Sequence, residues 1–458
     1  MSLDPVLARI DANLDAALAR LIELLKIQSV STDSDYDAET RRAGEWLVDD
    51  LRSMGVDAEL RDTPGHPMVV GHAGDSGPHV LFYGHYDVQP VDPIELWRRD
   101  PFDPAVEGEG DAAVIRGRGT ADDKGQLMTF VEAVRAWKAE TGDWPCRITF
   151  LFEGEEESGS PSLIPFLEAN RDELSAPDIA LICDTGMFDR DTPAITTMLR
   201  GMMKEEFTIH AARIDLHSGM YGGPAINPNR VLAKIITGLH DDEGRVTLPG
   251  FYDGVVETPD DIMAQWEALG FDAEKFLGDV GLSEPAGETG RTVLEQIWAR
   301  PTAEVNGMWG GYTGRGFKTV LPAEAHGKIS FRLVGTQDPA AISRAFRAYV
   351  DDLLPPDCSV SWHSYEGSPA SVMDTSDPKF ETARAALSDE WPNEAAFIGG
   401  GGSIPIAGYF KTILGLDSML IGFGLDDDAI HSPNEKYDVR SFHKGTRSWA
   451  RVLAALRG

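Results

Sequence analysis

The sequence predicts an α/β protein with a central, mostly parallel sheet carrying helices on both faces, and a smaller two-layer α+β domain inserted into it. Strand and helix patterns alternate up to about Arg200, which is typical of such a sheet. The predicted strands there are apolar along their whole length, as strands covered on both faces are. The pattern changes near Arg200 and returns near Ser368. We therefore expect a first domain formed by 1–199 and 368–458, with 200–367 inserted.

The first part of the chain begins with predicted helices. From Val6 to Leu25 apolar residues recur at helical spacing, and Pro5 suits a first turn because its missing N–H costs little there. A second helix is predicted over 41–55, where Gly55 suits the end. Strands follow over 68–73, 79–85, 147–154 and 178–184, and a helix over 126–140.

The inserted part has a different pattern, typical of a two-layer α+β unit. Half-buried strands are predicted over 205–213, 326–334 and 358–364, and helices over 227–240 and 338–354. Between them, 241–301 is rich in Gly, Pro and acidic residues, with one weak helix over 259–270. A segment so long and so poorly periodic is often functional or an elaborated edge. The chain closes with an amphipathic helix.

The composition argues against some classes of function. Asp and Glu number 75 and Lys and Arg 41, which gives a net charge of −34. This balance argues against sequence-independent nucleic-acid binding, which needs a basic face, and against docking on an anionic membrane. The excess of carboxylates suits solubility and can supply ligands for hard cations. Most of them are expected to form an ordinary solvated surface.

The cysteines and the N-terminal sequence indicate a compartment. Cys146, Cys183 and Cys358 are far apart and lack a CxxC spacing, so we expect buried free thiols in a reducing compartment. The first residues carry Asp and Arg throughout, unlike a signal peptide. No run approaches the roughly 18 apolar residues of a membrane span. We expect a cytoplasmic protein.

Polar clusters follow the predicted strands, where an α/β sheet usually builds its site. Each has an ordinary structural explanation, such as a helix cap at Asp122 or a strand end at Asp184. In a strand, however, His85 and Asp87 would point to the same face and could act together. The clusters are GHYD (His85, Asp87), GRGTADDKGQ (Asp122, Asp123), FEGEEESGS (Glu155, Glu156, Glu157), LICDTGMF (Asp184) and DDAIHSPNE (His431).

Taken together, these clusters point to metal ions. Two histidines and several carboxylates at strand ends make a mixed nitrogen and oxygen ligand set, compatible with Zn²⁺ or Mn²⁺. Without cations, carboxylates gathered in one place would repel each other and raise their pKa values. A pair of divalent cations removes that difficulty.

The series of motifs resembles the dinuclear metallopeptidases that include carnosinase-type dipeptidases, carboxypeptidase G and aminoacylases, and it is most similar to the dipeptidase branch. Several motifs in series are far more specific than one. The resemblance implies an inserted domain that acts as a lid and joins two subunits into a homodimer. The motifs run in the family's order through essentially the whole chain: GHYDVQP, GRGTADDKGQ, EEESGS, DLHSGMYGG, KTVLPAEAHGKISFRLV and GGSIP.

The resemblance implies two divalent ions per subunit, with zinc first and manganese or cobalt as alternatives. By residue-by-residue match, His85 and Asp184 hold one ion. Glu157 and His431 hold the other. Asp122 matches the carboxylate that bridges both, and the family usually has a cis peptide bond after it.

A reaction follows from the same resemblance. Asp87 matches the carboxylate that orients His85, because such support fixes the tautomer of a ligand histidine. Glu156 matches the general base, which takes a proton from a water bridging the ions and returns it to the leaving amine while hydroxide attacks an amide carbonyl. The triple run of glutamates leaves open a slip of one residue, in which Glu155 would be the base.

Further matches concern the substrate. His217 matches an inserted-domain histidine that stabilises the tetrahedral oxyanion and in this family often reaches the partner subunit's site. Arg332 matches a residue that grips the substrate's terminal carboxylate, a task suited to guanidinium. The alternative for Arg332 is a strand residue in a surface ion pair. Thr319 and Ser403 match smaller polar contacts.

Two features favour hydrolysis of dipeptides or short peptides. In the family, Asp at the position of Asp184 is more common in peptidases, whereas Glu is more common in deacylases and carboxypeptidases. The long insertion also resembles that of the dipeptidase branch. The alternative is an N-acyl-amino-acid amidohydrolase using the same site. A non-catalytic metal-binding protein is disfavoured because every predicted ligand and Glu156 are present. The stretch FIGGGGSIP lacks a charged pair that related dipeptidases often carry, so the sequence leaves the substrate open.

Overall fold

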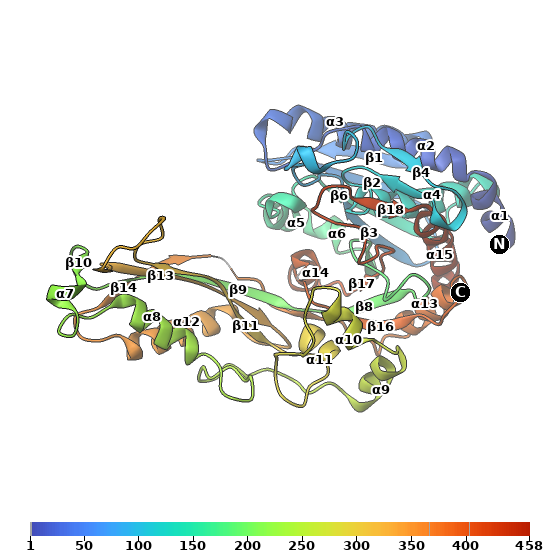
Figure 1. Cartoon of the computed structure of the whole chain (residues 1–458). Coiled ribbons are helices and arrows are strands. Elements are labelled where there is room, and N and C mark those ends of the chain that lie inside the picture. Colours follow the sequence, from blue (N-terminus) through green and yellow to red (C-terminus); the bar gives the residue numbers. More distant parts are fainter. Residues whose placement is uncertain (1, 366, 403) are drawn as a thin grey trace. The chain divides into compact units, whose positions relative to one another are not determined.

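The computed structural model describes residues 2–365, 367–402 and 404–458 (Figure 1). The chain forms two compact units. Unit 1 consists of Met1–Thr197, Met373–Ile398 and Tyr409–Gly458. Unit 2 consists of Met198–Val372 and Gly399–Gly408.

Unit 1 is built on a twisted sheet in the order β1-β2-β6-β3-β7-β17-β8, with β16 also paired to β8. The four central strands β6, β3, β7 and β17 are parallel, and the flanking pairs are antiparallel. The predicted α/β class is therefore confirmed. The strands are β1 (Asp57–Arg61), β2 (Met68–Ala73), β3 (His79–His85), β6 (Arg147–Glu153), β7 (Ile179–Ile182), β8 (Ala194–Leu199), β16 (Ala396–Gly400) and β17 (Ser418–Leu420).

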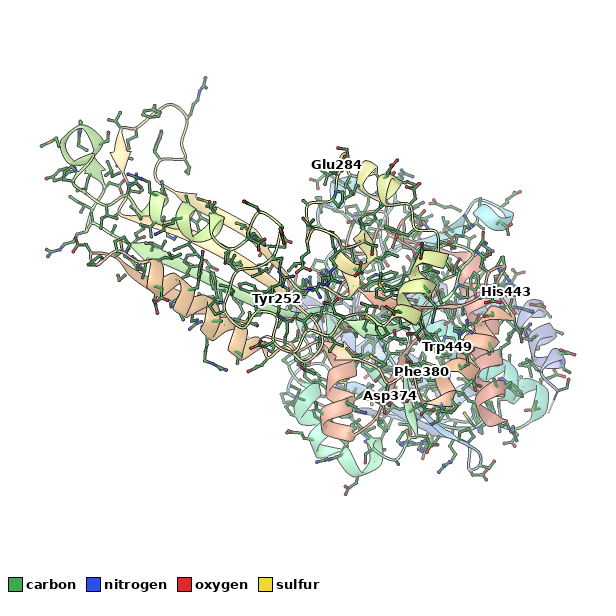
Figure 2. The ribbon with its side chains drawn as sticks, turned by 90° about the horizontal axis from the view of Figure 1, so that it is seen from below. Tyr252, Glu284, Asp374, Phe380, His443 and Trp449 are labelled. Carbon is green, nitrogen blue, oxygen red and sulfur yellow. The ribbon has the colours of Figure 1, made fainter. Side chains whose placement is uncertain are left out.

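Both faces of this sheet are covered, as the apolar strands predict. Neighbouring side chains of a strand point to opposite faces. On one face Phe82 stacks on Phe130 at 3.7 Å and contacts the edge of Trp449, which Figure 2 labels. On the other face Tyr83 meets Phe410. These partners come from α4 (Lys124–Thr141), α15 (Val439–Arg457) and the π-helical turn η5 (Phe410–Leu414).

The N-terminal apolar stripe forms two helices where the sequence suggests one. Helix α1 (Asp4–Ala12) ends at Asn13, whose side chain donates a hydrogen bond to the carbonyl of Arg9. Such local bonding offers the backbone an alternative to a continuous helix. Helix α2 (Leu14–Leu25) then continues the buried stripe. Helix α3 (Asp37–Ser53) stops as predicted at Gly55, which has a φ of 89°.

The rest of unit 1 consists of short elements around the sheet. A three-stranded sheet has the order β18-β5-β4. The elements are η1 (Ser34–Tyr36), η2 (Ile94–Leu96), β4 (Ala105–Glu107), η3 (Gly110–Ala112), β5 (Val114–Arg116), η4 (Glu156–Ser158), α5 (Leu163–Ala169), α6 (Arg171–Leu174), α13 (Pro378–Ser388) and β18 (Lys436–Asp438).

Unit 2 has the predicted two-layer α+β arrangement. Its antiparallel sheet has the order β11-β13-β9-β14. Phe346 of helix α12 is fully buried and contacts Phe207 and Phe331 from two strands. The elements are β9 (Gly201–His210), α8 (Pro228–Thr237), β11 (Thr302–Gly310), β13 (Glu324–Leu333), α12 (Pro339–Leu353) and β14 (Ser359–Ser364).

Shorter elements complete unit 2. The segment 241–301 holds three helices, of which the sequence predicts only the first. Within the described residues, none of the helices is both long and apolar enough to span a bilayer. The elements are β10 (Leu216–His217), α7 (Ser218–Tyr221), α9 (Asp260–Ala268), α10 (Ala273–Gly278), α11 (Val293–Trp298), β12 (Val320–Leu321), β15 (Ser371–Val372) and α14 (Pro405–Tyr409).

Candidate metal centre

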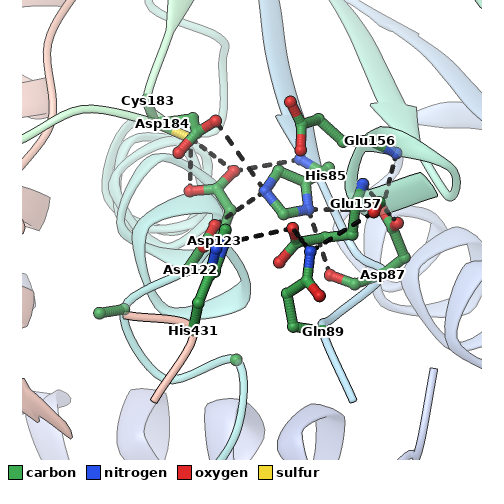
Figure 3. A network of polar contacts seen from close by, with 12 residues as sticks. His85, Asp87, Gln89, Asp122, Asp123, Glu156, Glu157, Cys183, Asp184 and His431 are labelled. Carbon is green, nitrogen blue, oxygen red and sulfur yellow. Dashed lines mark hydrogen bonds and ion pairs between the residues drawn. The ribbon is translucent and has the colours of Figure 1, made fainter. Parts of the chain in front are cut away.

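The predicted ligand residues of unit 1 meet at one edge of its sheet (Figure 3). His85 is the last residue of β3, and Asp184 follows the end of β7. The turn η4, which begins at Glu156, follows β6. Because β6, β3 and β7 are adjacent and parallel, their carboxyl ends reach the same edge, where α/β sheets bind ligands.

Asp122 lies between two imidazoles. Its Oδ1 is 3.0 Å from Nε2 of His85, and its Oδ2 is 2.9 Å from Nε2 of His431. Each carboxylate oxygen therefore faces a different histidine, which is the arrangement that a bridging carboxylate needs. The Asp122–Asp123 peptide bond is cis, as the family resemblance implies.

Two groups of side chains could each hold a cation. In the first, His85, Glu156 and Asp184 offer ligand atoms within 4.8 Å of one another. In the second, Asp122, Glu157 and His431 do the same. All five predicted ligands are thus brought together, and the first group also contains the predicted base.

Asp87 contacts both His85 and the turn that carries Glu156 and Glu157. Nδ1 of His85 is hydrogen-bonded to the backbone carbonyl of Asp87 at 3.1 Å and lies 3.3 Å from its Oδ1, so the ring's other nitrogen faces Asp122. The two carboxylate oxygens of Asp87 also accept hydrogen bonds from the backbone N–H groups of Glu156 and Glu157, at 3.2 and 3.0 Å. Asp87 therefore orients the imidazole through its carbonyl and carboxylate groups, and its carboxylate also fixes the position of the glutamate turn.

The three consecutive glutamates have separate surroundings. Both carboxylate oxygens of Glu155 accept backbone hydrogen bonds, from His66 at 2.6 Å and from Ser162 at 3.0 Å. Glu156 instead lies with the first ligand group and Glu157 with the second. This geometry favours the register in which Glu156 is the base and Glu155 is structural.

The electrostatics of the site show crowded carboxylates. Burial and the charge of Asp122 raise the pKa of Asp184 to about 7. Burial also raises the pKa of Glu156 well above its usual range, with Asp184 among the charges that add to the effect. Hydrogen bonds to Asp122 and Glu157 raise the pKa of His431 to about 10.

These donors fit a pair of divalent cations. Nε2 of each histidine lies within 3.2 Å of carboxylate oxygens, and divalent cations at these positions would relieve the repulsion between the carboxylates. Each group offers one imidazole nitrogen and carboxylate oxygens, a set that suits Zn²⁺ or Mn²⁺. His85, Asp122 and Asp184 would hold one ion, and Asp122, Glu157 and His431 the other.

Some supporting residues are absent from the sequence-based prediction. Gln89 donates to Oε2 of Glu157 at 2.7 Å, and Ser31 donates to Asp87 at 2.6 Å. Gln89 lies inside the GHYDVQP motif and could have been suspected from it. Ser31 lies in no motif, so no signal in the sequence points to it.

The remaining predicted residues belong to unit 2. His217 is exposed, and its Nδ1 accepts a hydrogen bond from the N–H of Gly219. The carbonyl of Thr319 accepts from the N–H of Ser218 in the same turn. Ser403 lies outside the described residues.

Arg332 lies on β13 with no acidic partner among the described residues. Its Nη1 is buried and has no hydrogen-bond partner in that part of the chain, and burial lowers its pKa. Arg200 lies just before β9, two residues from Met202, the strand partner of Arg332, and the charges of the two arginines interact. Burial and the charge of Arg332 lower the pKa of Arg200 to about 10. Sequence reasoning did not single out Arg200.

Comparison with known proteins identifies relatives over the whole chain. The pattern of Peptidase family M20/M25/M40 matches residues 81–455. The chain is 30% identical to the Cys-Gly metallodipeptidase dug1 of Schizosaccharomyces pombe, over 98% of this chain and 97% of that protein. It is 29% identical to the Beta-Ala-His dipeptidase of Homo sapiens, over 98% of this chain and 91% of that one.

Solved structures of similar fold also include a dipeptidase and an M20 family enzyme. Human carnosine dipeptidase 1 superposes with a TM-score of 0.83 at 28% identity, covering 100% of this chain and 99% of that one. The M20 family metallo-carboxypeptidase Sso-CP2 from Sulfolobus solfataricus gives 0.82 at 28% identity, with 96% and 99% covered. None of these names favours the amidohydrolase alternative.

Proposed function

The chain belongs to Peptidase family M20/M25/M40, and from this premise we propose that it is a metal-dependent dipeptidase whose two cations are held by His85, Asp122, Glu157, Asp184 and His431. The observation that carries the proposal is the position of Asp122. Its two oxygens face the two histidines at 3.0 and 2.9 Å, so one carboxylate serves both ligand groups.

The side chains of the site suit peptide-bond hydrolysis. Glu156 lies beside the first ligand group, and its raised pKa suits a group that accepts a proton from water and returns it to the leaving amine. Asp87 keeps His85 oriented throughout. When bound, the divalent cations supply Lewis acidity that polarises the amide carbonyl and acidifies water.

We propose two cations per subunit and zinc as the metal. The two ligand groups support the number, and the imidazole and carboxylate donors support zinc, with manganese or cobalt as alternatives. Metal analysis of the purified protein, with two equivalents of one metal per chain expected, tests both statements.

In unit 2, Arg332 is proposed to bind the carboxylate at the end of the substrate. The buried Nη1 of Arg332, which has no hydrogen-bond partner among the described residues, and the neighbouring positive charge of Arg200 suit an anion. Thr319 and Ser403 are proposed as smaller polar contacts, and His217 as the residue that stabilises the oxyanion.

We also propose a homodimer formed through unit 2. The strand β10, the helix α7 and the turn before β12 lie together at one end of that unit (Figure 1). These elements and the residues beside them expose large apolar side chains, which pairing with a second subunit would remove from water: Ile214, Met220, Tyr221, Tyr312 and Phe317, the last 90% exposed. His217 lies among them, which supports a role at the partner subunit's site.

The cytoplasmic location stays a prediction, supported by three cysteines that are all free thiols. The predicted domain boundaries, at 199/200 and 367/368, likewise stay a prediction.

The test of the function is a comparison of substrates. The purified zinc-loaded protein is expected to hydrolyse dipeptides, with Cys-Gly and β-Ala-His included in the panel, and to release little amino acid from N-acetyl amino acids. Preferential cleavage of the N-acetyl compounds would establish the amidohydrolase instead. Activity that survives complete chelation would overturn both.

A further inference from the structure

The buried carboxylate of Glu435 lies in the loop that carries His431 but binds the turn that carries Asp122. We propose that Glu435 is a positioning residue, which holds Asp122 between the two cation positions by accepting hydrogen bonds from the backbone of its turn. The inference rests on the metal centre proposed above and adds a residue outside its ligand set.

Both carboxylate oxygens of Glu435 accept hydrogen bonds from this turn. Oε1 accepts hydrogen bonds from the N–H groups of Ala121 and Asp122, at 2.9 and 3.2 Å. Oε2 accepts from the N–H of Gly119 at 3.0 Å and from Nη1 of Arg118 at 2.6 Å. The side chain is fully buried, so water does not compete for these four donors. Only a carboxylate offers acceptors on both oxygens at once.

The same contacts connect three loops that carry ligands. Arg118, itself 1% exposed, also donates to the carbonyl of Pro90, at the end of the motif that contains His85. The N–H of Gly117 donates to the backbone carbonyl of Glu435 at 3.1 Å. The Arg118–Glu435 pair therefore links the segments that carry His85, Asp122 and His431.

Asp122 needs such support because few groups in the described part of the chain hold its side chain. Among the described residues, its carboxylate is hydrogen-bonded by the two histidines alone. Once those imidazoles bind cations instead, only the backbone fixes the direction of the carboxylate. The backbone N–H of Asp122 is one of the groups that Glu435 holds.

The test is zinc binding by Glu435→Gln. The amide keeps the size of the side chain but replaces one acceptor with an NH₂ group, which would face backbone N–H groups or Arg118. Because Asp122 serves both ligand groups, we expect both Zn²⁺ equivalents to bind about 10–100-fold more weakly, measured by competition with a chromophoric chelator. We also expect a changed visible spectrum of the Co²⁺-loaded protein, which a loss of stability alone would not produce.

Glu390→Gln is the matched control. Glu390 is a nearly buried carboxylate of the same unit, bound by Arg447 and Arg451 at 2.8 Å and by Lys444. None of these residues belongs to the site. Its substitution is expected to lower the midpoint of thermal unfolding and to leave both Zn²⁺ affinities unchanged.

A double variant covers the case in which Glu435→Gln does not fold because Arg118 is left unpaired. Arg118→Met with Glu435→Gln removes both charges and is expected to fold and to bind both Zn²⁺ ions with the same weakened affinity. If either folded variant binds two Zn²⁺ as tightly as the wild type, the positioning role is wrong. If the wild type itself binds no pair of ions, the proposed metal centre fails, which is a distinct result.

Discussion

At the scale of single residues, identical side chains take different roles because their contacts differ, as in the run Glu155, Glu156 and Glu157. Backbone N–H groups occupy both oxygens of Glu155, whereas Glu156 and Glu157 each join a different ligand group. The turn η4 decides this, because it rotates successive side chains to different sides. A chemical role therefore belongs to a position in the turn and not to the residue type.

Replacing Glu156 by alanine is expected to abolish most turnover while both metals stay bound. A general base contributes about 10²–10⁴-fold to the rate, so kcat should fall by that factor. The measurement is kcat with a good dipeptide, together with metal content. Glu168→Ala, at an exposed position of α5, is the control and should behave like the wild type. Near-normal turnover in Glu156→Ala would refute the assigned role.

Glu153 gives a pH dependence of stability. Burial raises its pKa from 4.5 to about 7, and the hydroxyl of Tyr83, which donates to it at 2.6 Å, opposes this only in part. The folded state therefore binds the proton more tightly than the unfolded state. This contribution to stability is fully present below pH 4.5 and is lost as the pH rises through about 7.

Glu153→Gln should remove that dependence, since glutamine does not ionise. Relative to the variant, the metal-free wild type is expected to lose about 1–3 kcal/mol of unfolding free energy between pH 5 and pH 8. Urea unfolding of both proteins at the two pH values measures the difference. Parallel stability curves would show that Glu153 does not titrate in this range.

At the scale of elements, the two sheets are built differently and should respond separately to mutation. The central strands of unit 1 are buried on both faces, whereas along β9 in unit 2 each buried residue is followed by a half-buried or exposed one. Phe346 packs between that sheet and α12. The centroid of its ring lies 5.4–5.8 Å from the ring centroids of Phe331, Phe207 and Trp362.

Phe346→Ala is expected to destabilise unit 2 by about 3–5 kcal/mol, because it leaves a cavity under the sheet. Hydrogen exchange should rise in β9 and β13, while the metal content of unit 1 stays at two equivalents. Val280→Ala, at a position of unit 2 that is 71% exposed, is the control and should change stability by less than about 0.5 kcal/mol. Equal exchange in both units after Phe346→Ala would mean that they unfold together.

At the scale of the whole molecule, the proposed dimer makes a prediction about mixed subunits. Glu156→Ala removes the base, and His217→Ala removes the group proposed to reach the partner subunit. If His217 serves the partner's site, a mixed dimer contains one site with both residues. Random pairing of two equally expressed variants makes half of the dimers mixed, so about a quarter of wild-type activity is expected.

Coexpression of the two variants, followed by a dipeptide assay, measures this recovery. Each variant alone is the control, and sedimentation shows whether a dimer forms. Activity no higher than the mean of the two single variants, in a protein that is dimeric, would place His217 in its own subunit's reaction or outside the reaction.

Much of the molecule follows from local patterns. Apolar runs mark β2, β3, β6 and β7 because a strand buried on both faces must be apolar along its length. Strand β11 was not predicted, since a register shift between Val305 and Gly307 breaks its alternation. The break at Asn13 was also missed, because the bond that its side chain makes depends on the helix around it.

The sequence by itself determined the class of fold, the order of the motifs and the types of residue that gather at the sheet edge, because periodicity and motif spacing are local properties. The tertiary structure alone decided which oxygen of Asp122 faces which histidine and that backbone N–H groups donate hydrogen bonds to Glu155. It also decided that Glu435 and Arg200 lie beside predicted residues. These are contacts between segments distant in sequence, and no local pattern encodes the direction in which a side chain meets them.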